Sequence, residues 1–529
     1  MAIKKEQKVL PRSGVPSRPA ARSAANGRWL AALSGAGIGL GWTVPFLAPL
    51  LPVAWFGFLR ALARARSGRD AVRLGLAFGA GKYIVGSHFL LVLIRYSPLA
   101  IVFYLLAIVY ILPFSVLEGG GAYALERRTG VPRSIAYAVL WVVSEKLRTL
   151  TDLAFPADLM AHGYAGAPAF LGLASLVGTF GITLLGVAVA VLAERALLAW
   201  PRRGTALAWG AAACALFVAP VLATVASGPP AATARELRVG IVQPAVALED
   251  KVTEARTELV WQRLRALTRE AARGADLVVW PETARPKYSI LREGRIEDPE
   301  MAALAKDAGV PILYGVTIVG DALYNGAALV LPDGSIPQWY GKQHLLPLVE
   351  GVPFGRYFGW DPRARAREGK RKGYLGMLGN YAVGPEPTVF RVAGARIGVM
   401  VCFESQFPEL GRAYRRAGAN ALAVLTNDAW WGHSIFAPWH ARMVAVRARE
   451  LGIPVLRAAN NGISGIVASD GRTVARTELD ERRVLHVTLP LSDAPPTLYA
   501  AWGDWFPALA LFAIAALAVR GAFRRRRPV

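Results

Sequence analysis

Long apolar runs, more than any single motif, constrain how this chain of 529 residues can fold. A helix needs about 20 residues to cross the hydrocarbon core of a bilayer, and most of these runs approach that length. Seven runs lie before residue 227 and one lies near the C-terminus (29–42, 44–59, 74–94, 99–117, 134–143, 167–192, 206–226 and 505–519). We therefore expect a multi-pass membrane domain of about seven helices over residues 29–226, with a further membrane helix and a basic cytoplasmic tail within residues 496–529.

Three of these runs, 29–42, 44–59 and 134–143, are shorter than a full span. The second also holds Pro45, Pro49 and Pro52, and proline breaks a helix. We therefore expect tilted, interrupted or partly re-entrant helices here. The preceding residues, 1–28, are basic and lack apolar periodicity, which indicates a tail; a cleaved signal peptide is disfavoured because further apolar stretches follow at once.

Positive charge is distributed unevenly along the chain, which carries 61 basic and 37 acidic residues for a net charge of +24. If the tail is cytoplasmic and each run crosses once, four arginine-rich segments join it on the cytoplasmic side (60–73, 127–133, 195–203 and 520–527). The short outer loops hold only Arg95, Lys146 and Arg148. This positive-inside pattern predicts cytoplasmic termini and places the segment before the last helix outside. It also accounts for most of the concentrated basic charge, so we expect no nucleic-acid partner.

The segment between the seventh and eighth runs has the pattern of a soluble α/β domain. A short extended linker is expected at residues 227–236 and the domain itself at 237–495. Strands are expected at 237–242, 276–280, 312–318, 327–331, 395–402, 421–425, 455–459, 463–468 and 484–489, and helices at 254–272, 299–308, 408–417 and 437–451. Strands that alternate with helices indicate packed sheets flanked by helices. The basic residues 363–372 are expected to form an exposed loop.

A carboxylate and a thiol each follow directly after an apolar strand of this domain. Glu282 ends the segment Val-Val-Trp-Pro-Glu, and Cys402 is followed at once by polar residues and a helix start. Residues at strand ends commonly form the sites of α/β folds. Oriented backbone N–H groups at such a turn would lower the pKa of the Cys402 thiol and later stabilise an oxyanion. Lys342, between aromatic and apolar neighbours, is a candidate fixed cation.

Each of these residues also has a plainer interpretation. Glu282 would serve equally as a surface or helix-capping residue, Cys402 as an inert core cysteine, and Lys342 as a solvated side chain. The only other cysteine, Cys214, lies in the seventh apolar run and is expected to pack there. Two cysteines exclude a disulfide-stapled fold, and six histidines without paired spacing make a metal site unexpected.

Taken together and in this order, the three residues resemble the Glu-Lys-Cys triad of the carbon-nitrogen hydrolase (nitrilase) superfamily. Residues 426–432 (Thr-Asn-Asp-Ala-Trp-Trp-Gly) and 457–465 (Arg-Ala-Ala-Asn-Asn-Gly-Ile-Ser-Gly) resemble one branch in particular, the apolipoprotein N-acyltransferases. In that branch a periplasmic nitrilase-like domain lies between seven N-terminal spans and one C-terminal span. The resemblance covers nearly the whole chain after the tail. It implies an αββα sandwich on a multi-pass protein of the bacterial inner membrane.

The resemblance also implies roles for individual residues. Glu282 corresponds to the general base, Lys342 to the cation that supports the tetrahedral intermediate, and Cys402 to the nucleophile. Glu350 matches a second glutamate beside the lysine, and Phe403 stands where the family often has Tyr. No metal and no organic cofactor are implied.

Two segments depart from the family pattern. The family commonly has Pro-Phe-Gly-Glu after the lysine, whereas this chain has Pro-Leu-Val-Glu at 347–350. The stretch after Gln243, Pro244 to Val252, departs from the pattern with Asn, Pro and Trp that is often found there. These departures leave the triad intact and bear on the selectivity for donor and acceptor.

The resemblance implies transfer of a fatty acyl chain from a membrane phospholipid, through a cysteine thioester, to the α-amino group of a diacylglyceryl-modified apolipoprotein. This is the last step of bacterial lipoprotein maturation. Two alternatives remain open. One is a membrane-tethered amidase or nitrilase that hydrolyses a small carbon-nitrogen compound, and the other is a catalytically silent lipoprotein-binding scaffold.

Aromatic residues and histidines gather after the second family segment. Trp430, Trp431, Phe436 and Trp439 are expected either to line a lipid entrance or to serve as domain core and interfacial anchors. The histidines there, His433 and His440, are expected to be hydrogen-bonded structural residues rather than ligands.

Overall fold

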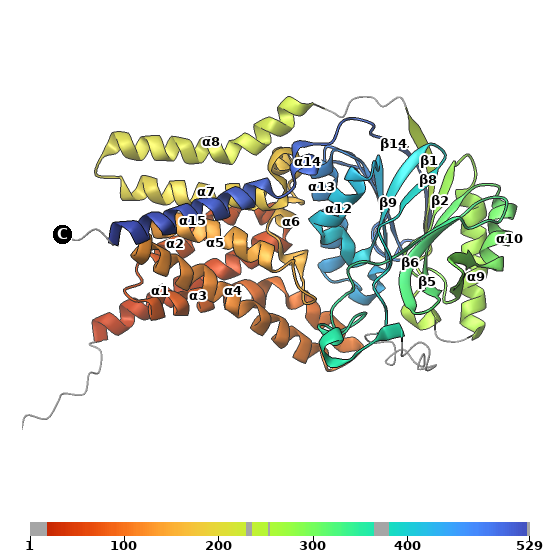
Figure 1. Cartoon of the computed structure of the whole chain (residues 1–529), viewed down its shortest axis with the longest axis horizontal. Helices are drawn as coiled ribbons and strands as arrows, with labels where there is room; N and C mark the ends of the chain where they lie inside the picture. The colour runs from red at the N-terminus through yellow and green to blue at the C-terminus, as the bar shows by residue number, and fades with distance from the viewer. Residues whose placement is uncertain (1–17, 229–234, 252–253, 364–379, 526–529) are drawn as a thin grey trace, which may run out of the picture.

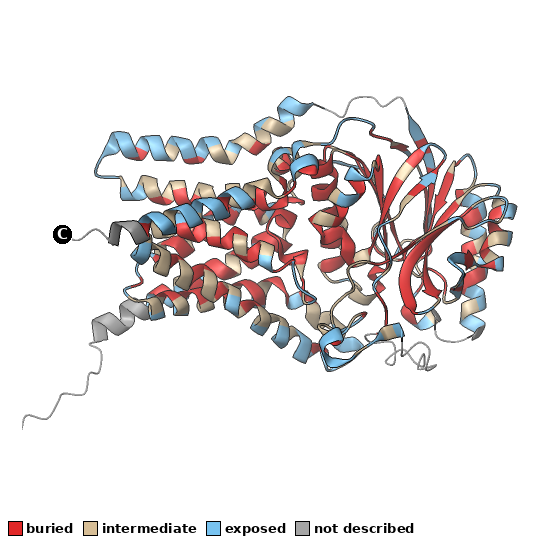
Figure 2. Ribbon diagram, in the orientation of Figure 1, coloured by how far each residue is buried: buried red, intermediate tan, exposed pale blue. Residues whose placement is uncertain are grey.

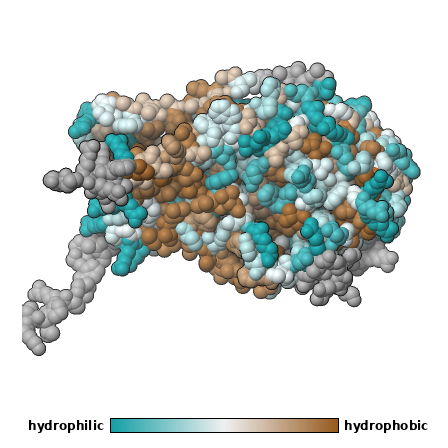
Figure 3. Space-filling model, viewed as in Figure 1, coloured by the Kyte–Doolittle hydropathy of each residue, from teal (hydrophilic) through white to brown (hydrophobic). Residues whose placement is uncertain are grey.

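The computed structural model describes residues 18–228, 235–251, 254–363 and 380–525, and it places a helical part beside an α/β part (Figure 1). Most of the expected basic loop, residues 364–372, lies outside the described residues, as do residues 229–234 of the expected linker. Figure 3 shows a broad hydrophobic surface over the helical part, whereas the α/β part is mostly hydrophilic. The hydrophobic surface is the one that a bilayer would cover.

Each of the eight expected apolar runs contains helix. The segments of the helical part are α1 (Arg18–Thr43), η1 (Pro45–Leu50), α2 (Leu51–Leu62), α3 (Gly68–Gly86), η2 (His88–Arg95), α4 (Ala100–Thr129), α5 (Arg133–Leu147), η3 (Pro156–Asp158), α6 (Ala161–Tyr164), η4 (Pro168–Leu171), α7 (Ala174–Leu198), α8 (Arg203–Ser227) and α15 (Trp505–Arg525). Helix α1 begins within the stretch expected to be a tail, because Pro19 suits a helix start and an alanine-rich segment follows it. The proline series lies at the junction of η1 and α2.

Fewer helices qualify as membrane spans by length and composition than the eight expected. Within the described residues, four helical segments qualify: Pro45–Leu62, α4, α7 and α8. A fifth arises if α3 and η2, which meet at a 45° bend, are taken as one span. The shortfall has a physical reason, since α5 has only 15 residues and α15 has a short apolar stretch.

The long helices differ in how far they face outward. Of the 18-residue apolar stretch in each helix, only 17% is buried in α4 and in α8, against 56% in α7 (Figure 2). Cys214 on α8 is exposed, so the expectation that it packs inside the protein is wrong. Helix α7 therefore belongs to the centre of the bundle, whereas α4 and α8 present apolar side chains to the surroundings.

Two sheets pack face to face in the α/β part, as the αββα expectation requires. The first sheet has the order β14-β1-β2-β5-β3-β4, with β6 beside β5 and β7 beside β6; the second has the order β13-β12-β11-β10-β9-β8. Helices α9 (Glu254–Ala271) and α10 (Pro299–Ala308) lie on the outer side of the first sheet, and α12 (Pro408–Arg416) and α13 (Phe436–Leu451) lie on the side of the second that faces the helical part (Figure 1).

All nine expected strands are present, and five short ones were not expected. The strands are β1 (Glu236–Gln243), β2 (Leu277–Val279), β3 (Tyr288–Arg292), β4 (Arg295–Glu297), β5 (Ile312–Val319), β6 (Leu323–Val330), β7 (Gln338–Gly341), β8 (Val389–Val392), β9 (Ala395–Val401), β10 (Ala421–Thr426), β11 (Val455–Ala459), β12 (Gly465–Val467), β13 (Thr473–Arg476) and β14 (Arg483–Pro490). The unexpected ones are β3, β4, β7, β8 and β13, of three to five residues each. Short strands that lie toward the sheet edges and mix polar with apolar residues carry little pattern to detect.

Polar contacts join α13 to α7 across the boundary between the two parts. Arg447 Nη2 donates to Thr179 Oγ1 at 2.6 Å, and that hydroxyl donates to Glu450 Oε2 at 2.8 Å. All three side chains are completely buried. Because an unpaired buried charge is costly, this contact fixes α13 against the helical part.

Gly178 provides a second point of attachment. It interrupts α7 with a φ of +67°, and a Cβ at this position would lie 2.2 Å from the ring of Tyr499 in α14 (Leu498–Trp502). Only glycine permits both this backbone conformation and the close approach of Tyr499. The C-terminal connection therefore docks into a notch in α7.

We expect Gly178→Ala to lower the apparent unfolding temperature in detergent. A side chain at positive φ and a steric clash together cost about 2–4 kcal/mol. The matched control is Gly210→Ala in α8, where a Cβ meets nothing within 4 Å and alanine favours the helix. Equal unfolding temperatures for wild type and Gly178→Ala would contradict the proposed notch.

Candidate active site

The structure brings the three expected residues together from three different strand ends. Glu282 follows β2, Lys342 follows β7 and Cys402 follows β9. Lys342 Nζ lies 4.0 Å from Glu282 Oε1, and both side chains are buried. Cys402 is half-buried, and both charges act on its thiol. The site therefore lies between the two sheets, at the ends of their strands.

Cys402 has an unusual backbone and a protonated thiol. Its φ is +53°, in the left-handed region, and it begins the turn η7 (Cys402–Gln406). Burial and the nearby Glu282 carboxylate raise the pKa of the thiol well above its ordinary value, and Lys342 offsets this only in part. The expectation of a lowered thiol pKa is therefore wrong, because desolvation outweighs the other influences. Such a thiol needs a base to become a nucleophile.

Lys342 is held as a cation by two glutamates. Its Nζ lies 2.9 and 2.8 Å from the two carboxylate oxygens of Glu350, whose Oε2 also accepts from the N–H of Leu346. Burial alone would lower the pKa of Lys342, but Glu350 and Glu282 outweigh it and hold the pKa above its ordinary value. Glu350, expected only as a supporting residue, is thus the direct ion-pair partner of the lysine.

Glu282 is anchored through both carboxylate oxygens. Oε1 accepts from Asn325 Nδ2 at 2.7 Å, and Oε2 accepts from the N–H of Asn427 at 2.9 Å. Burial raises the pKa of Glu282, and Lys342 opposes that effect. A carboxylate with a raised pKa beside a protonated thiol is suited to take its proton.

Sequence reasoning missed Asn325, which connects the two glutamates. Its Nδ2 donates to Glu282 Oε1 and to Glu350 Oε1, at 2.7 Å each, and its backbone carbonyl accepts from the N–H of Lys342. Asn325 lies on β6, and every residue of that strand is buried. A polar residue inside an otherwise apolar run was the available signal, since buried amides require partners.

Sequence reasoning also missed the structural role of Glu404 in the site. Its carboxylate accepts from Tyr340 Oη at 2.7 Å and from the N–H groups of Gln343, His344 and Val401 at 2.6, 3.1 and 2.7 Å. Burial raises the pKa of Glu404 to about 7. Glu404 therefore ties the segment that carries the lysine to the turn that carries Cys402.

Phe403 links this turn to the helical part. It is buried, and its ring lies 5.2 Å from that of Phe407 and 6.4 Å from that of Phe155, in the connection after α5. The residue next to the thiol thus contacts the helical part directly.

The expected aromatic cluster forms mainly a contact between the two parts of the molecule. Phe436 and Trp439 are buried, and Phe89 of η2 lies 4.8 and 5.7 Å from their ring centres. Trp430 and Trp431 are half-buried, and Arg95 donates to the carbonyl of Trp430. These contacts favour the core and anchoring interpretation for Phe436 and Trp439.

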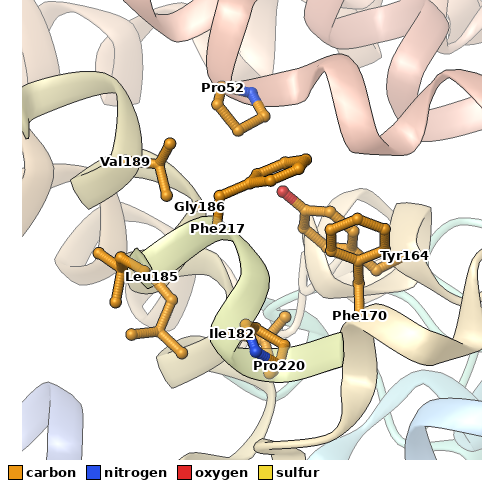
Figure 4. Close-up of a pocket in the computed structure, with 10 residues that line it drawn as sticks. Pro52, Tyr164, Phe170, Ile182, Leu185, Gly186, Val189, Phe217 and Pro220 are labelled. Carbon is orange, nitrogen blue, oxygen red and sulfur yellow. The ribbon is translucent and has the colours of Figure 1, made fainter. Parts of the chain in front are cut away.

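An apolar cavity lies apart from these residues, inside the helical part (Figure 4). It holds about 300 Å³ of empty space, part of it open to the outside, among residues of α2, α6, α7 and α8. Tyr164, Phe170 and Phe217 bring aromatic rings to it, with neighbouring ring centres 5.8 and 5.2 Å apart. None of Glu282, Lys342 or Cys402 lines this cavity.

As for metals, no group of three or more His, Cys, Asp or Glu side chains in the described ranges is arranged to hold an ion.

Comparisons with known proteins cover both parts of the chain. The family described as Apolipoprotein N-acyltransferase N-terminal domain matches residues 34–192, and the family described as Carbon-nitrogen hydrolase matches residues 238–498. Similar proteins named apolipoprotein N-acyltransferase occur in Geobacter metallireducens (29% identity, 94% of this chain and 95% of that protein) and Methylococcus capsulatus (31%, 84% and 86%). A third, from Brucella melitensis, is 32% identical over 68% of each.

Solved structures of the nitrilase superfamily align with the α/β part. Saccharomyces cerevisiae Nit3, a member of branch 10 of that superfamily, aligns over 49% of this chain and 91% of its own, with 18% identity and a TM-score of 0.38. An amidase from Nesterenkonia sp. aligns over 48% and 90%, with 19% identity and a TM-score of 0.35.

We expect Asn325→Ala to slow the alkylation of Cys402 by iodoacetamide about tenfold near neutral pH, as followed by mass spectrometry. A hydrogen bond to a charged group contributes about 1.5–3 kcal/mol, and its loss both frees the Glu282 carboxylate and raises its pKa further. Asn420→Ala is the control, because this buried asparagine precedes β10 at its other end and contacts Arg396 and Asp493. An unchanged rate for Asn325→Ala would show that Asn325 does not hold the base.

Proposed function

This chain belongs to the apolipoprotein N-acyltransferase family, and on that premise we propose that Glu282, Lys342 and Cys402 perform its acyl transfer. The acyl donor would be a membrane phospholipid, and the acceptor the α-amino group of an N-terminal diacylglyceryl-cysteine on an apolipoprotein. The single observation that carries the proposal is the buried cluster in which a base, a cation and a protonated thiol meet beside the helical part.

In the first half-reaction, Glu282 takes the proton of the Cys402 thiol, and the thiolate attacks an ester carbonyl of the phospholipid. The resulting oxyanion is stabilised by the ammonium of Lys342 and by backbone N–H groups of the turn after Cys402. As the tetrahedral intermediate collapses, the carbon–oxygen bond breaks and Glu282 returns its proton to the departing glycerol oxygen. The products are a lysophospholipid and a thioester on Cys402.

In the second half-reaction, the neutral α-amino group of the acceptor attacks the thioester. An α-amino group has a pKa near 8, so a fraction of it is neutral at pH 7. Glu282 takes the proton that the nitrogen loses, and the carbon–sulfur bond breaks. The proton passes to the departing thiolate, which regenerates the thiol of Cys402 and leaves an amide on the acceptor.

The protein is an inner-membrane protein, and the membrane placement follows from where the charges and the apolar surface lie. We propose that the α/β domain, residues 237–495, lies on the periplasmic side, and that residues 1–28 and the basic end that follows the last membrane helix, within 496–529, lie in the cytoplasm. Both substrates carry acyl chains, so a thiol at the outer surface of the bilayer meets them without extracting them into water. The broad hydrophobic surface of the helical part in Figure 3 supports its position in the bilayer, and the distribution of basic residues supports the proposed side.

We expect purified enzyme incubated with phospholipid to acquire an acyl mass on Cys402 that hydroxylamine removes, since hydroxylamine cleaves thioesters. Cys402→Ala lacks the sulfur and should show no adduct in intact-mass spectrometry. Cys214→Ala is the matched control, because this cysteine is exposed on α8 and should leave the adduct unchanged. Release of the adduct by a diacylglyceryl peptide with a free amine, rather than by water, would distinguish a transferase from a hydrolase. A wild-type enzyme that never becomes acylated would refute the mechanism.

We also expect the rate of acyl-enzyme formation to fall on acidification. The fall should occur at a pH above the ordinary pKa of a glutamate carboxylate. Glu282 must be ionised to act as the base, and burial raises its pKa above the ordinary value near 4.3. The rate should therefore be high above this raised pKa and should fall as the pH decreases through it. Glu282→Gln should reduce the rate by about 10²–10⁴-fold and remove this acid limb. Persistence of the limb in Glu282→Gln would assign it to another group.

A further inference from the structure

The short outer loops expected from the sequence hold three basic residues, and two of these are paired with carboxylates. Lys146 Nζ lies 2.5 Å from Asp504 Oδ2, and Arg148 Nη1 lies 2.5 Å from Asp158 Oδ2. Arg95, at the end of η2, is exposed and forms no ion pair with a carboxylate in the described part of the chain. The mechanism above gives this side chain no task. An exposed and unpaired guanidinium is suited to bind an anion.

The guanidinium of Arg95 is held in one place by the turn η8 (Asp428–Trp431) and its neighbours. Arg95 Nη2 donates to the carbonyl of Trp430 at 3.1 Å, and Arg95 Cζ lies 5.0 Å from the centre of the Tyr96 ring. Gly432 makes room for the group, because a Cβ at that position would lie 2.3 Å from Arg95 Nη2. The bond to Trp430 uses one of the five N–H donors of the guanidinium, which leaves the others for a ligand.

One carboxylate lies near this group without pairing with it. Burial raises the pKa of the Tyr96 hydroxyl, Arg95 lowers it, and Glu249 in η5 (Leu248–Lys251) adds to the rise. Glu249 is thus close enough to act on Tyr96, but no ion pair among the described residues joins it to Arg95. Because its negative charge weakens the attraction of Arg95 for an anion, direct hydrogen bonds to the guanidinium must supply the affinity.

Arg95 lies at the level expected for the headgroup of an outer-leaflet lipid. It ends the bent span that α3 and η2 form, and α4 begins shortly after it. The first half of α4 presents large apolar side chains that are each 47–59% exposed (Ile101, Val102, Leu105, Leu106 and Val109). Tyr96 and Trp430, with ring centres 5.4 Å apart, lie above them, as aromatic residues do at a membrane surface. A lipid whose chains cover these side chains would bring its phosphate to Arg95.

The turn that holds Arg95 also follows the contact that holds the proposed base. η8 begins directly after Asn427, whose N–H donates to Glu282 Oε2 at 2.9 Å. Since a 3₁₀ helix rises about 2 Å per residue, Trp430 lies about 6 Å further along the turn than Asn427. A separation of this size suits a glycerol backbone, which connects the phosphate of a phospholipid to its ester carbonyls.

We propose that Arg95 binds the phosphate of the phospholipid that donates the acyl chain. Its planar fork can form two parallel N–H···O bonds with a phosphate, whereas a lysine acts as a point charge. This inference rests on the proposed function, and it distinguishes the two half-reactions. The donor carries a phosphate and the diacylglyceryl acceptor carries none, so Arg95 contacts substrate in the first half-reaction only.

The first test measures acylation of Cys402 against the concentration of phosphatidylethanolamine in micelles of a neutral detergent. We expect Arg95→Gln to raise the donor concentration at half-maximal rate about 5- to 20-fold, as loss of hydrogen bonds to a charged group does. The maximal rate should stay within about twofold of wild type, because a contact made equally before and during the reaction affects binding alone. Arg95→Lys keeps the charge without the fork and should give an intermediate concentration.

The second half-reaction separates phosphate binding from a merely structural role. If Arg95 only supported η8, its loss would disturb Glu282, which serves as the base in both half-reactions. We therefore expect acyl-enzyme that has been formed at saturating phospholipid to react with a diacylglyceryl peptide at the same rate in Arg95→Gln and in wild type.

Two variants serve as controls. Tyr96→Phe removes a hydroxyl that donates to the carbonyl of Ala429 in the same turn, at 3.2 Å, and leaves the guanidinium in place. Arg292→Gln removes a remote arginine that is 72% exposed. Both should keep the wild-type donor concentration at half-maximal rate.

Two results would overturn the phosphate-binding role. One is a wild-type donor concentration in Arg95→Gln, or in Arg95→Lys if the glutamine variant does not fold. The other is equal slowing of both half-reactions. A wild-type enzyme that never acquires the acyl mass would instead overturn the proposed function.

Discussion

The buried ammonium of Lys342 is the constraint on which the site depends. A cation removed from water needs compensating charge, and Glu350 and Glu282 supply it from the two sides. The carboxylates must in turn be kept apart and hydrogen-bonded, which Asn325 achieves by donating to both. Four residues from three chain segments are therefore placed before any substrate arrives, and such preorganised charge is the usual source of electrostatic catalysis.

The same charges explain why the thiol of Cys402, the proposed nucleophile, remains protonated at rest. Glu282 is an anion beside Cys402, and together with burial it disfavours a second negative charge there. Lys342 reduces this penalty without removing it. In the proposed mechanism the proton therefore leaves sulfur only as it arrives on the carboxylate, which couples deprotonation to attack. A resting thiol is also less exposed to oxidation than a thiolate.

Much of the fold could be predicted from the sequence, because apolar runs followed by polar residues mark the strand ends of α/β domains. The three central residues were singled out by their resemblance to the Glu-Lys-Cys triad, and their roles stay a prediction. Asn325 stood out only as a polar residue in an apolar run; its role could not be predicted, since it depends on the antiparallel pairing of β6 with β5 and β7, which the sequence does not display. His440 was expected to be a hydrogen-bonded structural residue, and its contact with Asp428, 3.0 Å between Nδ1 and Oδ1, agrees with this. The number of qualifying spans differed because α5 and the apolar stretch of α15 are shorter than a full span.

Helix α13 contacts both the second sheet and the helical part, and its position therefore sets the distance between the thiol and the bilayer. One side of this helix covers the second sheet, and the other meets α7 through Arg447, Thr179 and Glu450. The distance between the sulfur of Cys402 and the membrane helices is thus set by contacts within the protein. Because these contacts join the two parts, we expect the lipids rather than the sulfur to adjust in membranes of different thickness. The same contacts imply that the α/β domain released from its helices would expose a buried ion pair and the rings of Phe436 and Trp439.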